Sequence, residues 1–140
     1  MRALARRVQH LEAEIAEHDA AMKSLIDRAA PQLIAERVVG YVTAAAFYLA
    51  WSHPGRCRSE AGYARLGGIA PIEVTSGQNQ DRHRLNRGGD RQLDRALYFV
   101  AVTRQRCCPT AQDYMARRAS EGKTEREATP CLKRFIARRV

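Results

Sequence analysis

The chain lacks the cysteine spacing that is typical of a zinc site. Its four cysteines are Cys57, Cys107, Cys108 and Cys131. None forms a Cys-x-x-Cys pair, and the adjacent Cys107 and Cys108 would point to different faces of a helix, so we expect no metal site. The sequence also lacks a secretory signal peptide. We therefore expect reduced thiols and a cytoplasmic location.

Long apolar runs and strand-rich regions are missing as well. The longest apolar run, Val42–Trp51, is far too short to span a bilayer, so no membrane partner is expected. Only a short piece near Ile69–Val74 has an extended pattern, and at 140 residues the chain can form a modest core. The sequence predicts an all-α protein. We expect a coiled-coil helix over residues 1–30, then a small helical domain over residues 31–140.

Positive charge is what the sequence has in excess, and most of it lies in the C-terminal part. The chain has 24 basic and 15 acidic residues, a net charge of +9. Residues 1–30 are balanced, whereas residues 81–140 carry 15 basic and seven acidic residues. This asymmetry indicates a polyanionic partner, most often nucleic acid. The alternative is an arginine-rich, soluble helical domain from a GC-rich genome.

The N-terminal residues carry a heptad pattern. Apolar residues recur at alternating steps of four and three, with one histidine among them: Leu4, Val8, Leu11, Ile15, His18, Met22, Leu25 and Ala29. This is the a/d pattern of a coiled coil, and it predicts a homo-oligomer formed through this helix. An amphipathic helix packed on its own domain has the same pattern. Pro31 should end or reset the helix.

Residues 33–51 have the pattern of two helices joined by a short turn at Gly40. This arrangement resembles a helix-hairpin-helix element, whose turn presents backbone N–H groups to a DNA phosphate. The usual turn contains Pro-Gly-x-Gly, but Arg37-Val38 stand here in place of Pro-Gly. Because loss of that glycine hinders close approach of a phosphate, a purely structural hairpin is the alternative.

Local capping signals predict the later helices. Polar N-caps precede two of them, a proline starts one, a glycine ends one, and a Thr/Glu capping box begins the last. We expect Ser59 to cap a helix over Glu60–Leu66, and Asp90 to cap one from Arg91 to about Cys107. Pro109 should start a helix that Gly122 stops, and Thr124 with Glu127 should begin a helix toward Val140.

The stretch Leu66–Asp90 carries the candidate site. Ser76 lies in a predicted loop and is followed by basic residues and a glycine pair that leads into a helix. A hydroxyl beside cations and free N–H groups at a helix start suits a phosphodiester. The residues expected to contact DNA are Arg82, His83, Arg84, Arg87, Gly88, Gly89 and Arg91. On pattern alone, a solvated basic loop and a turn hydroxyl at Ser76 are the alternatives.

Taken together, several ordered motifs resemble the insertion-sequence 110 family of bacterial transposases, also called the insertion-sequence 116/110/902 family. The resemblance extends from about Leu33 to the C-terminus. The motifs are Arg58-Ser59-Glu60, Leu66-Gly67-Gly68-Ile69-Ala70-Pro71, Ser76-Gly77, the run from His83 to Leu93, Ala116-Arg117-Arg118 with Glu121-Gly122-Lys123, and Lys133-Arg134.

The resemblance implies the C-terminal part of a DNA transposase that works in two parts. A RuvC-like domain with an acidic tetrad for divalent metal precedes a coiled coil and a helical domain that carries a serine. That serine attacks a DNA phosphodiester, forms a phosphoserine link and passes the strand to a new end. By position it is Ser76, after Thr75, where family members often have Ser-Ser-Gly. DNA is the implied partner, and some members are also guided by an RNA.

The RuvC-like domain is missing from this sequence, so we expect a truncated copy or an interrupted reading frame. Magnesium would bind only with that domain, and no cofactor is expected in this chain. A hydroxyl near its free pKa is a poor nucleophile without a base or a metal, so we expect no DNA cleavage by the isolated chain. Two other functions stay open: a non-catalytic DNA-binding and oligomerisation module, and a basic helical RNA-binding protein.

Overall fold

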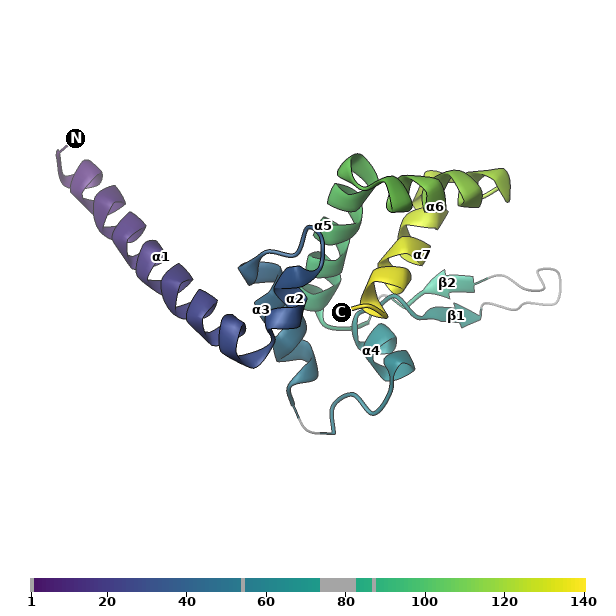
Figure 1. The fold of residues 1–140 in the computed structure, drawn as a ribbon, viewed down its shortest axis with the longest axis horizontal. Coiled ribbons are helices and arrows are strands. Elements are labelled where there is room, and N and C mark those ends of the chain that lie inside the picture. Colours follow the sequence, from purple (N-terminus) through teal and green to yellow (C-terminus); the bar gives the residue numbers. More distant parts are fainter. Residues whose placement is uncertain (1, 54, 74–82, 87) are drawn as a thin grey trace. The chain divides into compact units, whose positions relative to one another are not determined.

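The computed structural model describes residues 2–53, 55–73, 83–86 and 88–140, and Figure 1 shows its ribbon. In these residues it contains seven helices and two short strands, so the predicted all-α class is confirmed. The helices are α1 (Arg2–Ala29), α2 (Pro31–Ala35), α3 (Tyr41–Trp51), α4 (Glu60–Leu66), α5 (Arg91–Cys107), α6 (Pro109–Ser120) and α7 (Glu125–Ala137). The strands are β1 (Pro71–Glu73) and β2 (His83–Leu85).

The chain forms two compact units, residues 1–45 and 46–140. The division into a coiled-coil helix at 1–30 and a transposase domain at 31–140 stays a prediction. In the first unit, α1 is 28 residues long and residues 2–21 are all exposed. The a/d residues Leu4, Val8, Leu11 and Ile15 are 39–69% exposed. The apolar stripe over these residues is therefore exposed in the described part of the chain.

The start of α2 shows the effect of Pro31. Helix α1 ends at Ala29, and Pro31 occupies the first turn of α2, where a missing N–H costs no helical hydrogen bond. The two helices contact each other, and Ile26, Ala30 and Leu33 are buried. The prediction that Pro31 ends the first helix is confirmed.

The turn between α2 and α3 has an unusual backbone. Val38 has a φ of 68°, in the left-handed region that a β-branched side chain disfavours. It stands where a helix-hairpin-helix turn would have glycine. Gly40 immediately precedes α3. Its N–H donates to the Thr43 hydroxyl at 3.0 Å, while that hydroxyl donates to the Gly40 carbonyl at 2.8 Å. Helices α2 and α3 flank this turn, but the helix-hairpin-helix element and phosphate binding by its turn stay predictions.

The core of the second unit lies among α5, α6 and α7, which contact one another, with α4 against α7. In Figure 1 these three helices are the green and yellow ribbons. The side chains in this unit with at most 1% exposure are Phe47, Ile69, Leu93, Leu97, Val100, Ala101, Ala128, Leu132 and Ile136. Leu93, Leu97, Val100 and Ala101 of α5 follow helical spacing, so one face of this helix supplies much of the core.

The capping predictions are confirmed in this unit. The Ser59 hydroxyl accepts from the N–H of Gly62 at 3.1 Å, and the Asp90 carboxylate accepts at the start of α5. The Glu127 carboxylate accepts from the N–H of Thr124 at 3.0 Å, as a capping box requires. Helices α4 and α5 have the predicted bounds. Gly122 follows α6 with a φ of 82°, a conformation that ends a helix readily when the residue is glycine.

Two polar contacts join α5 to α7 inside this unit. Lys133 is 6% exposed, and its ammonium pairs with the Asp94 carboxylate. Gln105 Nε2 donates to Thr129 Oγ1 at 3.1 Å. A buried lysine without a partner would be strongly unfavourable, so the Asp94 carboxylate is what permits Lys133 at this position.

Strands β1 and β2 pair in antiparallel fashion, with Pro71 opposite Leu85, Ile72 opposite Arg84 and Glu73 opposite His83. The short extended piece expected near Ile69–Val74 contains β1. The sequence pattern did not predict β2, because a three-residue strand shows no periodicity.

Candidate nucleic-acid interface

The structure describes only some of the residues predicted to form the site. Ser76, Arg82 and Arg87 lie outside the described residues. The backbones of His83 and Arg84 lie on β2, opposite Glu73 and Ile72. Gly88, Gly89 and Arg91 follow at the start of α5. The described part of the site is therefore the strand pair and the turn that leads into α5.

Two glycine pairs pack against each other at this turn. Gly89 has a φ of 153°, and a Cβ atom there would lie 2.5 Å from the Leu66 carbonyl oxygen and 3.1 Å from the Gly68 nitrogen. The next N–H, of Asp90, donates to the same Leu66 oxygen at 2.7 Å. Gly68 itself has a φ of 67° and lies against the Asn86 carbonyl. Packing of backbone on backbone thus explains Gly68 and Gly89, and DNA contacts at Gly88 and Gly89 stay a prediction.

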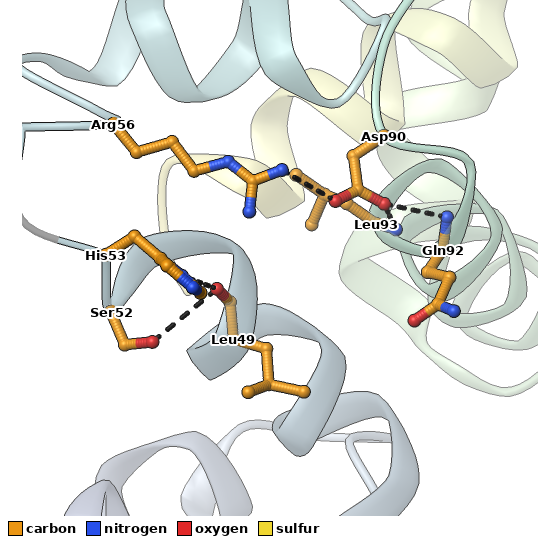
Figure 2. Close-up of polar contacts among 7 residues, drawn as sticks. All are labelled: Leu49, Ser52, His53, Arg56, Asp90, Gln92 and Leu93. Atoms are coloured by element: carbon orange, nitrogen blue, oxygen red, sulfur yellow. Dashed lines mark hydrogen bonds and ion pairs between the residues drawn. The ribbon is translucent and has the colours of Figure 1, made fainter.

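Asp90 occupies the start of α5 and changes one expectation. Its carboxylate accepts from the N–H groups of Gln92 at 2.9 Å and Leu93 at 3.1 Å (Figure 2). These N–H groups were expected to be free for a phosphate oxygen. That expectation is wrong for these two donors, because the carboxylate already supplies the negative charge that the helix N-terminus favours.

Arg56 reaches the same carboxylate from the loop after α3. Its Nη2 lies 3.2 Å from Asp90 Oδ2, and Figure 2 shows the side chain extending from that loop to the start of α5. His53, in the same loop, has its Nδ1 3.0 Å from the Leu49 carbonyl. Arg56 was not predicted from the sequence. The 34 residues that separate it from Asp90 leave no local signal for the pair.

An aromatic residue lies close to this ion pair. Tyr63 is 4% exposed and packs edge-on against Trp51, with ring centroids 5.4 Å apart. Burial raises the pKa of the Tyr63 hydroxyl well above its usual range, and Cys57 and Asp90 raise it further. Tyr63 therefore stays neutral and adds no second negative charge that would compete with the Asp90 carboxylate for Arg56.

The acidic residues at the start of α5 each have a cation from another element. Asp90 pairs with Arg56, and Asp94 pairs with Lys133. Neither carboxylate needs Arg91 or Arg95 as its counter-ion, and both arginines are exposed. The outer face at this end of α5 is thus positive, as a phosphate-contacting surface requires.

Metal ligands do not gather in the described part of the chain. There, no group of three or more histidine, cysteine, aspartate or glutamate side chains is placed to hold a metal ion. The four cysteines all lie within the described residues, and none is in a disulfide. Among the described residues, no helix is both long and apolar enough to cross a membrane.

Comparison with known proteins agrees with these motifs. Residues 32–116 match the family described as Transposase IS116/IS110/IS902 family, and this is more than half of the chain. The chain belongs to this family. The matched residues include the Val38 turn, both glycine pairs and Asp90, so the resemblance inferred from the motifs is confirmed.

One relative is much longer than the region that aligns with this chain. The insertion element IS110 uncharacterized 43.6 kDa protein of Streptomyces coelicolor (strain ATCC BAA-471 / A3(2) / M145) is 31% identical over 98 residues. The aligned region is 70% of this chain but 24% of that protein. The chain therefore spans about a quarter of the relative that it matches.

Proposed function

We propose that this chain is the DNA-binding, serine-bearing part of an IS110-type transposase. The observation that supports this most is the family match over residues 32–116, which includes Ser76 and the basic residues after it. The packing of Gly68 against Gly89 adds support, because it fixes both ends of that segment beside the positive face of α5. Catalysis of strand transfer would be an activity of the whole transposase.

In the proposed reaction, the Ser76 oxygen attacks a DNA phosphorus. A bond forms between this oxygen and phosphorus, the bond from phosphorus to one sugar oxygen breaks, and the released sugar hydroxyl takes up a proton. The hydroxyl of another strand end then attacks the same phosphorus. A new bond from phosphorus to this sugar oxygen forms, the bond to the Ser76 oxygen breaks, and Ser76 takes up a proton. Arg82, Arg84 or Arg87 would stabilise the charge on the phosphoryl oxygens. His83 is either a proton shuttle or a DNA contact.

The described residues do not provide a set of metal ligands, so no step in this chain is assigned to a metal. Magnesium would belong to the RuvC-like domain of the complete enzyme, where it would activate the hydroxyl and polarise the phosphate. This chain's share would be to position DNA and to supply the nucleophile.

A covalent adduct tests the nucleophile directly. The chain would be mixed with the RuvC-like portion of a close relative, magnesium and labelled element-end DNA, and the protein–DNA adduct would be measured on denaturing gels. We expect Ser76→Ala to abolish the adduct while changing DNA affinity only a few fold. Thr75→Ala, the matched loss of a neighbouring hydroxyl, should keep it. An adduct that survives Ser76→Ala would exclude Ser76 as the nucleophile.

The phosphate contacts have their own test. Replacing Arg82, Arg84, Arg87 and Arg91 by alanine should weaken duplex binding and lower the slope of log K against log salt by about 0.9 for each phosphate that is no longer neutralised. Replacing the four arginines of the neutral N-terminal part, Arg2, Arg6, Arg7 and Arg28, is the matched control. An equal decrease of slope in both variants would place the interface elsewhere.

A second function is supported by α1. Its exposed stripe fits a non-catalytic module that binds DNA and forms mixed coiled coils with full-length transposase. The adduct assay separates the two functions, since this module would form none. Tighter binding to structured RNA than to duplex DNA at equal salt would instead favour the RNA-binding alternative or a guided enzyme.

A further inference from the structure

An aromatic stack with arginines joins α6 to α7. The Tyr114 ring of α6 and the Phe135 ring of α7 have centroids 5.7 Å apart and planes 26° apart. Arg117 and Arg118 lie over Tyr114, at 5.3 and 5.0 Å from its centroid. Phe135, Arg117 and Arg118 thus all adjoin the Tyr114 ring, and we call these four side chains the ladder.

The outer end of this ladder is open. Phe135 is 45% exposed, although its neighbours Leu132 and Ile136 in the same helix are at most 1% exposed. Tyr114 stacks on one side of the ring, and nearly half of the Phe135 surface stays open to solvent. The structure therefore leaves an aromatic residue of this stack accessible to a partner.

The ladder is also held in place. Arg118 Nη1 donates to Glu121 Oε2 at 2.7 Å, which fixes the guanidinium that lies over Tyr114. Phe135 lies between two core residues on a helix whose inner face is packed against α5 and α6. Binding to such a pre-ordered surface loses little side-chain entropy.

The net charge of the segment that contains α6 and α7 indicates the kind of partner. Residues 109–140 carry eight basic and four acidic residues. Stacked aromatic rings beside cations are how proteins bind unpaired bases, with the rings contacting the base and the cations the phosphates. A base inside a duplex has both faces covered by its neighbours and cannot stack on Phe135, whereas an unpaired base can.

We propose that Phe135, backed by Tyr114, is a stacking platform for an unpaired base of single-stranded DNA. Arg117 contributes positive charge at the Tyr114 end of the ladder, whereas the charge of Arg118 is balanced by Glu121. This proposal rests on the proposed DNA-binding function and makes it more specific, since it assigns single-stranded DNA to the α6–α7 face. Duplex phosphates would contact the start of α5.

Another exposed phenylalanine serves as the matched control. Phe99 of α5 is 50% exposed and has Arg95 at 5.4 Å from its centroid. Its aromatic neighbour Tyr98 is 6.3 Å away and tilted by 58°, so the two rings form no flat stack. Phe99→Ala removes the same atoms as Phe135→Ala, without removing a platform.

The test compares affinities of the whole chain for three labelled probes by fluorescence anisotropy. The probes are oligothymidylate of about 12 nucleotides, the matching uridine RNA and a duplex of equal length. Phe135→Ala should weaken binding of the single-stranded DNA by about 5- to 100-fold. It should change duplex binding by less than about twofold. Phe135→Trp should bind as the wild type does, and Phe99→Ala should leave all three affinities unchanged.

The possible outcomes separate this proposal from the proposed function. If the wild type binds no probe, both fail. If the wild type binds DNA, two results exclude only the platform. In one, Phe135→Ala weakens single-strand and duplex binding equally; in the other, it weakens neither. A loss confined to the RNA probe would overturn the assignment to DNA. Phe135→Leu, which keeps apolar contact with Tyr114 but removes the aromatic face, should match Phe135→Ala and guards against an effect of misfolding.

Discussion

Helices α1 and α5 have similar apolar stripes but opposite surroundings. In α1, Leu4, Val8, Leu11 and Ile15 are 39–69% exposed, and Ile26 is the buried residue of this helix. In α5, Leu93, Leu97 and Val100 are at most 1% exposed, because α6 and α7 cover them. The same periodicity thus specifies a helix in both places, but it does not say where the covering surface comes from. For α5 that surface is in the same unit, and for α1 we propose a second chain.

The largest expected effect is the loss of self-association through α1. Leu11→Glu combined with Ile15→Glu puts charges at a and d positions, where burial against a partner helix would be strongly unfavourable. We expect the wild type to form oligomers in light scattering over a concentration series, and this variant to be monomeric. Gln9→Glu with Ala13→Glu adds the same charge on the opposite face of α1 and should still associate. A wild type that stays monomeric at high concentration would rule out the coiled coil.

The core of α5 should show the next largest effect. Leu97 is 0% exposed, so Leu97→Ala should lower the free energy of unfolding by about 2–5 kcal/mol. Leu4 is 69% exposed, and Leu4→Ala should change the free energy of unfolding by less than about 0.5 kcal/mol in a monomeric sample. Urea denaturation followed by circular dichroism measures both. Similar losses for the two variants would mean that the stripe of α1 is covered within the chain after all.

The glycine pair before α5 allows a matched comparison at a smaller scale. Gly89→Ala places a Cβ atom 2.5 Å from a backbone oxygen and should cost about 1–3 kcal/mol or more. Gly88→Ala meets Asn86 Oδ1 at 3.3 Å, an atom that accepts from the Gly88 N–H at 3.0 Å; a shift of a few tenths of an ångström relieves this contact and should cost less than about 1 kcal/mol. Thermal melts of the two variants test this. If duplex binding falls for Gly88→Ala while its melting temperature is unchanged, Gly88 acts through DNA and not through packing.

The smallest effect is expected at the turn after α2. Val38 has a φ of 68°, and Val38→Gly should raise stability by about 1 kcal/mol because glycine adopts this conformation without strain. The change is expected in the unfolding of residues 1–45 and not in that of the second unit. Hydrogen exchange resolved by peptide can measure it. A lower stability would mean that the contacts of the Val38 side chain outweigh the relief of strain.

The sequence predicted the features of the fold that depend on near neighbours. Caps at Ser59, Asp90 and Thr124 act within three residues, so the bounds of α4 and α5 could be predicted from them. Strand β2 could not, because its partner Pro71–Glu73 lies on the far side of a segment with no pattern. The pairs Arg56–Asp90 and Lys133–Asp94 were missed for the same reason, since their partners are 34 and 39 residues apart.

The site was predicted less completely than the fold. The motif from His83 to Leu93 located the start of α5 and its capping aspartate correctly. It did not reveal that Gly89 packs on Leu66, or that the Asp90 carboxylate takes the N–H groups expected for a phosphate. A glycine required by a neighbouring backbone and one required by a ligand look the same in a sequence. The roles of Ser76, Arg82 and Arg87 stay predictions.

The contact between Gly68 and Gly89 has a consequence for protein engineering. The chain comes back to nearly the same point at Gly89, since a Cβ atom on Gly89 would lie 3.1 Å from the Gly68 nitrogen. Ile69, next to Gly68, is still part of the core, and β1 and β2 pair beyond it, so this end of the segment is held by packing as well as by backbone contact. Because doubling the length of a closed segment costs only about 0.6 kcal/mol in entropy, sequences of different length placed between Glu73 and His83 should be tolerated without disturbing α5.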